Sequence, residues 1–227
     1  MHPTAMDNAA KFYQTYLPVG AGKVIVEIGS QDVNGSIRSV APSDAKYIGV
    51  DFAAGKGVDV IIDDPYSLPF ENESVDICTS SSVFEHSEMF WLLFLEILRI
   101  LKPGGLFYLN VPSNGDFHRY PVDCWRFYPD AGKAMISWAK RNQYTPCMLE
   151  SFVSSQNGDI WNDFVAIYLK NKNHLADFPA RILHQKTDFL NGFISGNVDI
   201  LNHSRFAEDN KKMIAIKQII DNQIKVT

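Results

Sequence analysis

Short, continuous apolar runs alternate with polar loops and one helix-like segment over the first half of this 227-residue chain. Runs such as "VIVEI" and "LFYLNV" are too short for typical helices and lack the polar-apolar alternation of a half-exposed strand. Such runs are typical of parallel strands, which are buried on both faces. We therefore predict strands at residues 23–28, 47–50, 58–62, 75–79, 106–111 and 164–169.

The clearest helical segment is "EMFWLLFLEILRILKPGG", in which Glu96 and Arg99 interrupt an apolar surface. We expect Pro103-Gly104-Gly105 to stop this helix before the next strand. Strand, helix, strand units in series predict an α/β fold, a doubly wound, mostly parallel sheet with helices on both faces. Ligands bind such sheets at the carboxyl ends of the strands, so the loops there are the candidate sites.

Composition narrows the class of protein. A net charge of −5 argues against a nucleic-acid partner, which requires a basic face. The longest apolar stretch, 89–95, is too short to span a membrane, and the first residues do not resemble a signal peptide, so we expect a cytoplasmic protein. The 3 cysteines show no paired spacing, which favours reduced structural thiols over a zinc site or a disulfide framework.

The first two predicted strands end in acidic residues. In "EIGSQDVNGSIR", Gly29 removes a Cβ that would obstruct a ligand, and Glu27 precedes it. Asp51 follows about 20 residues later, the separation at which a carboxylate meets ribose hydroxyls in doubly wound folds. Loop-ordering roles explain Glu27 and Asp51 equally well at this point.

Two longer strings carry a resemblance to a known family. "LPFENESVDICTSSSVFEH" is followed by "LRILKPGGLFYLNVP", and together with the first two loops they resemble class I S-adenosylmethionine-dependent methyltransferases of the small-molecule type. The resemblance covers residues 23–111. It implies a Rossmann-like, seven-stranded sheet with one antiparallel strand near the C-terminal edge, and S-adenosylmethionine as the cofactor.

The resemblance also implies roles for particular positions. Asp51 would bind the ribose hydroxyls, Phe52 would lie against the adenine, and Asp63 would face the adenine amino group. The first loop would hold the methionine part of the cofactor, although Gln31 and Val33 stand where members of the family usually have glycines. The full set of predicted cofactor residues is Glu27, Gly29, Ser30, Gln31, Asp51, Phe52, Asp63 and Ser81.

The acceptor side is expected in a loop and helix at residues 112–146, which contain "FHRYPVDCWRFY". Histidine is the side chain best suited to take a proton from a hydroxyl near neutral pH. We predict His86, His118 and Asp123 as catalytic, with packing or loop hydrogen bonds as the alternative for the histidines. The predicted substrate residues are Arg119, Tyr120, Trp125 and Arg126, with surface ion pairs and aromatic packing as their alternatives.

The remaining residues carry less functional information. We expect a single domain over 1–227, in which 171–227 form a C-terminal helical extension. In the tail, "KKMIAIKQIIDNQIKV" places Met213, Ile216, Ile220 and Ile224 near one helical face, for packing on the domain or for a homodimer contact. His174, His184 and His203 have no metal-ligand spacing, and we expect no metal site.

The sequence thus predicts a methyltransferase that acts on a small molecule or saccharide, with oxygen as the preferred acceptor atom and nitrogen not excluded by any residue. Two other functions stay open. A non-catalytic binding or scaffold protein would explain the irregular first loop. An NAD-dependent oxidoreductase would use Asp51 on its ribose, but the G-x-G-x-x-G pattern is absent.

Overall fold

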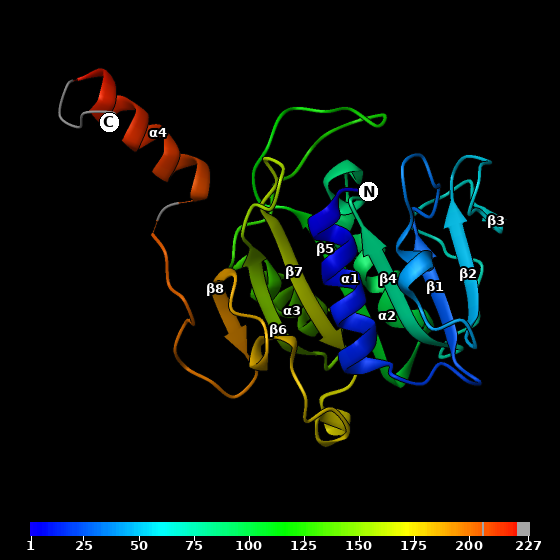
Figure 1. Cartoon of the computed structure of the whole chain (residues 1–227). Coiled ribbons are helices and arrows are strands. Elements are labelled where there is room, and N and C mark those ends of the chain that lie inside the picture. Colours follow the sequence, from blue (N-terminus) through cyan, green and yellow to red (C-terminus); the bar gives the residue numbers. More distant parts are fainter. Residues whose placement is uncertain (206, 222–227) are drawn as a thin grey trace.

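The structure is a computed structural model that describes residues 1–205 and 207–221. One sheet runs through the domain in the order β3-β2-β1-β4-β5-β7-β6-β8 (Figure 1). Its strands are β1 (Val24–Ile28), β2 (Lys46–Asp51), β3 (Val60–Ile61), β4 (Val75–Ser81), β5 (Leu101–Pro112), β6 (Cys147–Ser154), β7 (Asp163–Leu169) and β8 (Phe189–Ile194). The helices are α1 (Pro3–Tyr16), α2 (Phe90–Ile100), α3 (Ala131–Arg141) and α4 (Glu208–Ile220), with 3-10 turns η1 (Ile37–Val40), η2 (Phe84–His86), η3 (Lys172–Asp177) and η4 (Ile182–His184).

The strand directions confirm the predicted fold class. Strands β1 to β5 pair in parallel, β7 runs antiparallel to both β5 and β6, and β8 runs antiparallel to β6. The sheet therefore has one strand more than the predicted seven, and two of its strands are antiparallel to the rest. Strand β8, "FLNGFI", contains Asn191 and Gly192, residue types that are depleted in strands, which explains why the sequence did not reveal it.

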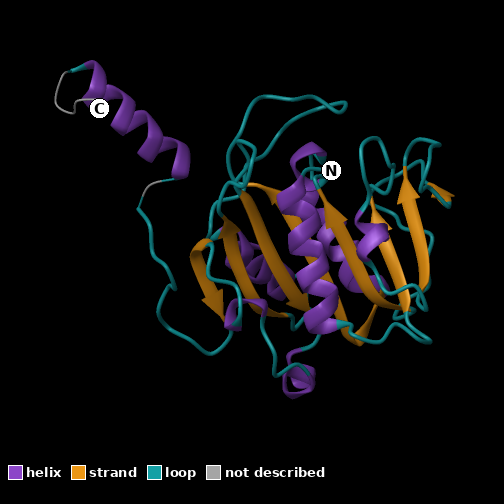
Figure 2. Cartoon of the chain, in the orientation of Figure 1, coloured by secondary structure: helices purple, strands orange, loops and turns teal. Residues whose placement is uncertain are grey.

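Helices cover both faces of the sheet (Figure 2). Helix α1 lies on one face, where Phe12 packs on Tyr108 with ring centroids 4.8 Å apart. Helices α2 and α3 lie on the other face, against the buried side chains of β4, β5 and β7. Since both faces are covered, the strands read as apolar runs, as the sequence analysis assumed.

The Pro103-Gly104-Gly105 segment differs from the prediction. Helix α2 already ends at Ile100, and the three residues lie inside β5. The pairing with β4 shifts there, from Val75 opposite Leu101 to Ile77 opposite Leu106. Proline has no N–H for a ladder bond, so the extra residues form an irregularity at the start of the strand.

The segment after β7 is only partly helical, because it also contains β8. Helix α4 projects away from the sheet (Figure 1), and Glu208 in its first turn accepts a hydrogen bond from the Gln156 backbone N–H at 2.9 Å. Met213, Ile216 and Ile220 are exposed, whereas Ile224 lies outside the described residues. In the described ranges, no helix has the length and apolar character needed to cross a membrane.

Candidate active site

A cavity of about 740 Å³ opens at the carboxyl ends of the parallel strands. Its wall comes from the loops after β1, β2, β3 and β4 and from the loop that follows β5, which rises above the sheet in Figure 1. Six predicted cofactor residues line it, namely Gly29, Gln31, Asp51, Phe52, Asp63 and Ser81. Four predicted acceptor-side residues line the same cavity, namely His86, His118, Arg119 and Tyr120. The predicted cofactor residues and the predicted acceptor residues therefore line one continuous hollow, whose two parts we call the cofactor end and the acceptor end.

Asp51, the last residue of β2, organises the cofactor end. Its carboxylate accepts backbone N–H bonds from Gln31 at 3.1 Å and from Ala53 at 3.2 Å. The carboxylate thus fixes the loop after β1 relative to the end of β2, and it still faces the cavity. The two interpretations of Asp51 from the sequence, loop ordering and ligand contact, are compatible in this geometry.

Gly29 is required by packing as well as by backbone conformation. Its φ is +74°, and a Cβ there would lie 2.1 Å from a methyl carbon of Val83. Our expectation that the missing Cβ makes room for a ligand needs correction, because Val83 fills that space. The backbone of Gly29 still lines the cavity.

Gln31 occupies a position where a glycine is usual in the resembled family. Its side-chain nitrogen donates to the Ala54 carbonyl at 3.2 Å, and its amide oxygen accepts from the Tyr120 hydroxyl at 2.8 Å. The second bond joins the loop after β1 to the loop after β5 across the cavity. The departure from the family pattern therefore gives this chain a polar bridge over its cofactor end.

Phe52 and Asp63 flank the mouth of the cofactor end. The Phe52 side chain is 56% exposed, and Asp63 is also exposed. An exposed aromatic ring and a carboxylate in the lining of one cavity fit a flat base with an exocyclic amino group. Ser81 lies deeper and is buried at the end of β4.

Glu27 and Ser30 are predicted cofactor residues that do not line the cavity. Side chains alternate along β1, so Ile28 faces the cavity and Glu27 points to the α1 face. There its carboxylate accepts a 2.8 Å hydrogen bond from the Tyr47 hydroxyl, and burial raises the pKa of Glu27 to about 7. Ser30 is buried under the loop.

Asp123 and Arg126 form an internal clamp of the loop after β5. Arg126 donates to the two Asp123 oxygens at 2.6 and 2.8 Å, and this pairing lowers the pKa of Asp123 to about 2. Asp123 also accepts the backbone N–H of His118 at 2.7 Å. Neither side chain lines the cavity. Arg126 therefore forms an ion pair with Asp123, which the sequence analysis gave as the alternative to substrate binding.

Trp125 also lies outside the cavity lining. Its indole N–H donates to the Ser87 carbonyl at 2.9 Å, and its ring packs on Phe90 and Trp91. The backbone N–H groups of Cys124 and Trp125 donate to the Glu85 carbonyl at 2.7 and 3.2 Å. Trp125 therefore holds the loop against η2 and α2 from outside the cavity. This is the aromatic packing that the sequence analysis gave as the alternative to substrate binding.

His86 and His118 face each other at the acceptor end, with ring centroids 5.0 Å apart. His86 Nδ1 is 2.5 Å from the Val122 carbonyl oxygen, and His118 Nδ1 is 3.0 Å from the Asp116 carbonyl oxygen. A carbonyl only accepts, so each Nδ1 carries a proton, and in the neutral form of each ring the Nε2 lone pair is free. An Arg126 nitrogen also approaches His118 Nδ1, but at the longer distance of 3.4 Å. Burial lowers the pKa of His86, which favours its neutral form.

Glu85 completes this cluster, and the sequence analysis gave it no role. It is fully buried in η2, lines the cavity, and has one carboxylate oxygen 3.7 Å from His86 Nε2. Within residues 1–205 and 207–221, neither carboxylate oxygen has a hydrogen-bond partner on another residue. Desolvation raises the pKa of Glu85 to about 8. Its adjacency to His86 in "FEH" was the available sequence signal.

Asp163 and His2 were also missed. The His2 ring lies 2.7 Å from an Asp163 carboxylate oxygen, and both residues line the cavity. Asp163 begins β7, which is antiparallel, so its first residue pairs with Pro112 at the carboxyl end of β5. No sequence signal connects residues so far apart.

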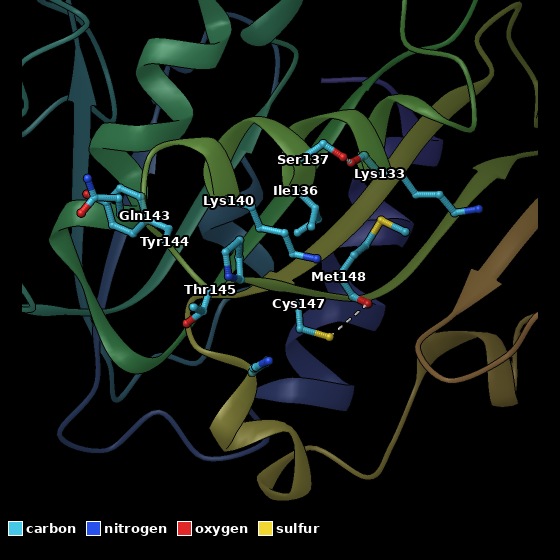
Figure 3. Close-up of a pocket in the computed structure, with 11 residues that line it drawn as sticks. Lys133, Ile136, Ser137, Lys140, Gln143, Tyr144, Thr145, Cys147 and Met148 are labelled. Carbon is cyan, nitrogen blue, oxygen red and sulfur yellow. Dashed lines mark hydrogen bonds between the residues drawn. The ribbon is translucent and has the colours of Figure 1, made fainter.

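A second hollow, of about 730 Å³, lies between α3 and the start of β6 (Figure 3). Its lining includes Lys133 and Lys140 on α3, Tyr144 in the link after that helix, and Cys147 at the start of β6. None of the predicted site residues line it. The candidate active site is therefore the cavity above the parallel strands.

The strand order and the position of the cavity define a doubly wound α/β protein that binds its ligand at the carboxyl ends of parallel strands. Residues 20–109 match the family model described as a methyltransferase domain. An uncharacterized methyltransferase of Mycobacterium leprae is 36% identical over 103 residues, which are 39% of this chain and 37% of that protein. The chain thus matches well under half the length of this curated relative.

Solved structures support the fold. A 1,6-didemethyltoxoflavin-N1-methyltransferase of Burkholderia thailandensis, with its substrate and S-adenosylhomocysteine bound, has a TM-score of 0.55 at 14% identity, covering 74% of this chain and 78% of that one. A geranyl diphosphate C-methyltransferase of Streptomyces coelicolor has a TM-score of 0.51 at 12% identity, covering 72% of this chain and 77% of that one. Residues 20–109 and the fold thus make this chain similar to methyltransferases, two of which hold S-adenosylhomocysteine in their solved structures.

Proposed function

We propose that this protein transfers a methyl group from S-adenosylmethionine to a small molecule or saccharide, with a hydroxyl oxygen as the acceptor atom. The observation that carries the proposal is the continuity of the cavity. One end presents Asp51, Phe52 and Asp63 from successive strand ends, and the other presents the imidazoles of His86 and His118. A volume of about 740 Å³ is within the usual range for small-molecule sites.

The cofactor end fits S-adenosylmethionine. Asp51 supplies carboxylate oxygens for ribose hydroxyls, Phe52 supplies a ring face for the adenine, and Asp63 supplies an acceptor for its amino group. Ser81 lies at the end of β4, between this end and the histidines. Glu27 has no contact with the cavity in this proposal, and the buried Tyr47 bond makes it a structural residue.

Bound S-adenosylmethionine would supply an activated methyl group, whose C–S bond would break with its electron pair going to sulfur. The chain's residues orient the acceptor, whose oxygen forms the new C–O bond and whose proton must leave. His86 Nε2 and His118 Nε2 have free lone pairs at the acceptor end and are the groups that would contact the hydroxyl. Correct placement of acceptor and methyl group supplies much of the rate.

We favour oxygen as the acceptor atom because a hydroxyl is only weakly acidic and must lose its proton, and the histidine pair could assist that loss. Arg119 and Tyr120 line the same end and would bind polar groups of the acceptor. The relatives named above methylate nitrogen and carbon, so the acceptor atom is the finer part of the proposal. A cytoplasmic location and a homodimer stay predictions.

Calorimetry with S-adenosylmethionine, S-adenosylhomocysteine and NAD tests the cofactor. We expect both adenosyl ligands to bind more tightly than NAD, and the reverse order would overturn the proposal. A mass-spectrometric screen of hydroxylated metabolites and sugars for a gain of one methyl group then tests the acceptor. Tight cofactor binding without any transfer across that screen would favour the scaffold alternative.

A further inference from the structure

We propose that Glu85, His86 and His118 bind one divalent transition-metal cation at the acceptor end of the cavity. One ligand atom from each of these residues lies within 4.8 Å of the other two. A cation at their centre would draw them closer, because bonds to imidazole nitrogen and carboxylate oxygen are about 2.0–2.2 Å long. All three residues line the cavity, so a cation there would keep coordination positions open toward a ligand.

The buried Glu85 carboxylate is the second observation that points to a ligand. It has no exposed surface, and among the described residues no other residue gives either oxygen a hydrogen bond. A buried polar group without a partner costs free energy, and a carboxylate more than a neutral group. Two backbone N–H groups hold the Glu85 carbonyl, so the residue is fixed in this position. A cation between Glu85 and the two imidazoles would supply the missing partner.

In their neutral forms the two histidines suit metal ligation. Each Nδ1 donates to a backbone carbonyl, of Val122 and of Asp116, and His86 Nε2 lies 3.7 Å from a Glu85 carboxylate oxygen. Metal-bound histidines commonly donate their other ring N–H to a carbonyl or carboxylate, which fixes the ring orientation. These hydrogen bonds therefore preorganise both imidazoles.

The charges around the cluster are compatible with a cation. Arg126 approaches His118 to 3.4 Å, and Asp123 pairs with this guanidinium through two hydrogen bonds. Two imidazoles and one carboxylate favour first-row transition metals such as Zn²⁺ or Mn²⁺ over Mg²⁺ and Ca²⁺, which prefer oxygen ligands. We expected no metal site because the sequence shows no metal-ligand spacing. The three residues of this cluster are brought together only by the fold, since His118 lies far along the chain from Glu85 and His86.

The cation site itself does not depend on the proposed function. Only the action of the cation on the acceptor hydroxyl rests on the proposed methyl transfer. A coordinated hydroxyl is more acidic than a free one, so its proton would leave to solvent without a histidine base. The oxygen would then form the C–O bond as the C–S bond breaks. In that case the imidazole Nε2 atoms hold the cation and do not take the proton.

The direct test is calorimetric titration of the full chain with Zn²⁺, Mn²⁺ and Mg²⁺. We expect one equivalent of Zn²⁺ or Mn²⁺ to bind, with weaker binding of Mg²⁺. Glu85→Gln and His118→Gln should each weaken binding by at least roughly 10–100-fold, the range reported for loss of groups that only support metal ligands. Glu71→Gln, an exposed carboxylate outside the cavity lining, and His174→Asn, a partly exposed histidine also outside it, are the matched controls and should bind as the parent does.

X-ray absorption spectroscopy of the zinc-loaded parent protein keeps the test independent of variant folding. Two imidazole nitrogens in the first coordination shell are expected. No saturable binding, equal binding by Glu85→Gln and the parent, or a first coordination shell without imidazole would overturn the metal site.

If the cation binds but S-adenosylmethionine does not, the proposed function fails and the metal site stands. If methyl transfer persists unchanged with a chelator, the role toward the acceptor is overturned.

Discussion

Two buried glutamates lie on opposite sides of the sheet region that holds the cavity, and they differ in their partners. Glu27 faces α1 and receives a hydrogen bond from Tyr47, whereas Glu85 faces the cavity and has no such bond among the described residues. Burial raises the pKa of both, to about 7 and about 8. Burial and a shifted pKa therefore do not by themselves mark a functional carboxylate. The difference lies in whether the fold has already satisfied the group.

The largest expected effect concerns the acceptor end. His86→Gln and His118→Gln should each lower the rate of methyl transfer by roughly 10²–10⁴-fold, the usual contribution of a group that assists proton loss. Cofactor affinity should stay nearly unchanged, since neither residue belongs to the cofactor end. Single-turnover kinetics and calorimetry measure the two quantities, with His174→Gln as the control. Full turnover in both variants would move the transfer site away from these histidines.

The next largest effect is the contribution of Glu27 to the free energy of unfolding, which depends on pH. The folded pKa of about 7 lies above the ordinary value of 4.5, so the folded protein holds a proton that the unfolded chain releases. The contribution of Glu27 to the stability is full below pH 4.5 and is lost as the pH rises to about 7. Glu27→Gln should therefore raise the free energy of unfolding at pH 8 by on the order of 3 kcal/mol.

Chemical denaturation of the parent and of Glu27→Gln at pH 4.5 and at pH 8 measures this effect. The gain should be present at pH 8 and nearly absent at pH 4.5. Glu71→Gln, at an exposed position, should show little difference at either pH. A Glu27→Gln protein that is less stable than the parent at pH 8 would mean that the favourable interactions of the carboxylate with Tyr47, Arg38 and Ser36 outweigh the cost of its burial.

A smaller effect is expected at the cofactor end. Asp51→Ala should weaken S-adenosylmethionine binding by about 1–3 kcal/mol, through loss of ribose contacts and of the bonds that order the loop. Asp51→Asn keeps one acceptor oxygen and should lose less. Asp64→Ala, which lies outside the cavity lining, is the control. Calorimetry with S-adenosylhomocysteine checks all three, and unchanged affinity in Asp51→Ala would remove Asp51 from the cofactor site.

The smallest effect concerns the bridge between the two ends. Tyr120→Phe removes the 2.8 Å hydrogen bond to Gln31, and a bond of this kind contributes about 0.5–1.5 kcal/mol. We expect S-adenosylhomocysteine to dissociate no more than about tenfold faster, because the bridge crosses the cofactor end. Stopped-flow fluorescence measures the rate, and Tyr128→Phe is the control. A slower dissociation would contradict the bridge as a closing contact.

Much of the fold was predictable from sequence because parallel strands buried on both faces leave a strong apolar signal. The strand ends were predictable for the same reason, and Asp51, Phe52 and Asp63 lie at or just after the ends of strands whose carboxyl ends meet at one edge. Strand β8 was not, because Asn191 and Gly192 weaken its signal. The position of Pro103 was read as a helix stop, although the helix had already ended at Ile100.

By itself, the sequence determined the parallel part of the sheet, the order of its loops and the residue types available at the cavity. Tertiary structure alone decided which of those residues face it. Alternation along β1 turned Glu27 away, the Asp123–Arg126 pair closed on itself, and the antiparallel β7 brought Asp163 to the cavity from the other half of the chain. Glu85, His86 and His118 became neighbours because the loop after β5 folds back over η2. Side-chain direction and long-range contact depend on packing in three dimensions, which local sequence patterns do not encode.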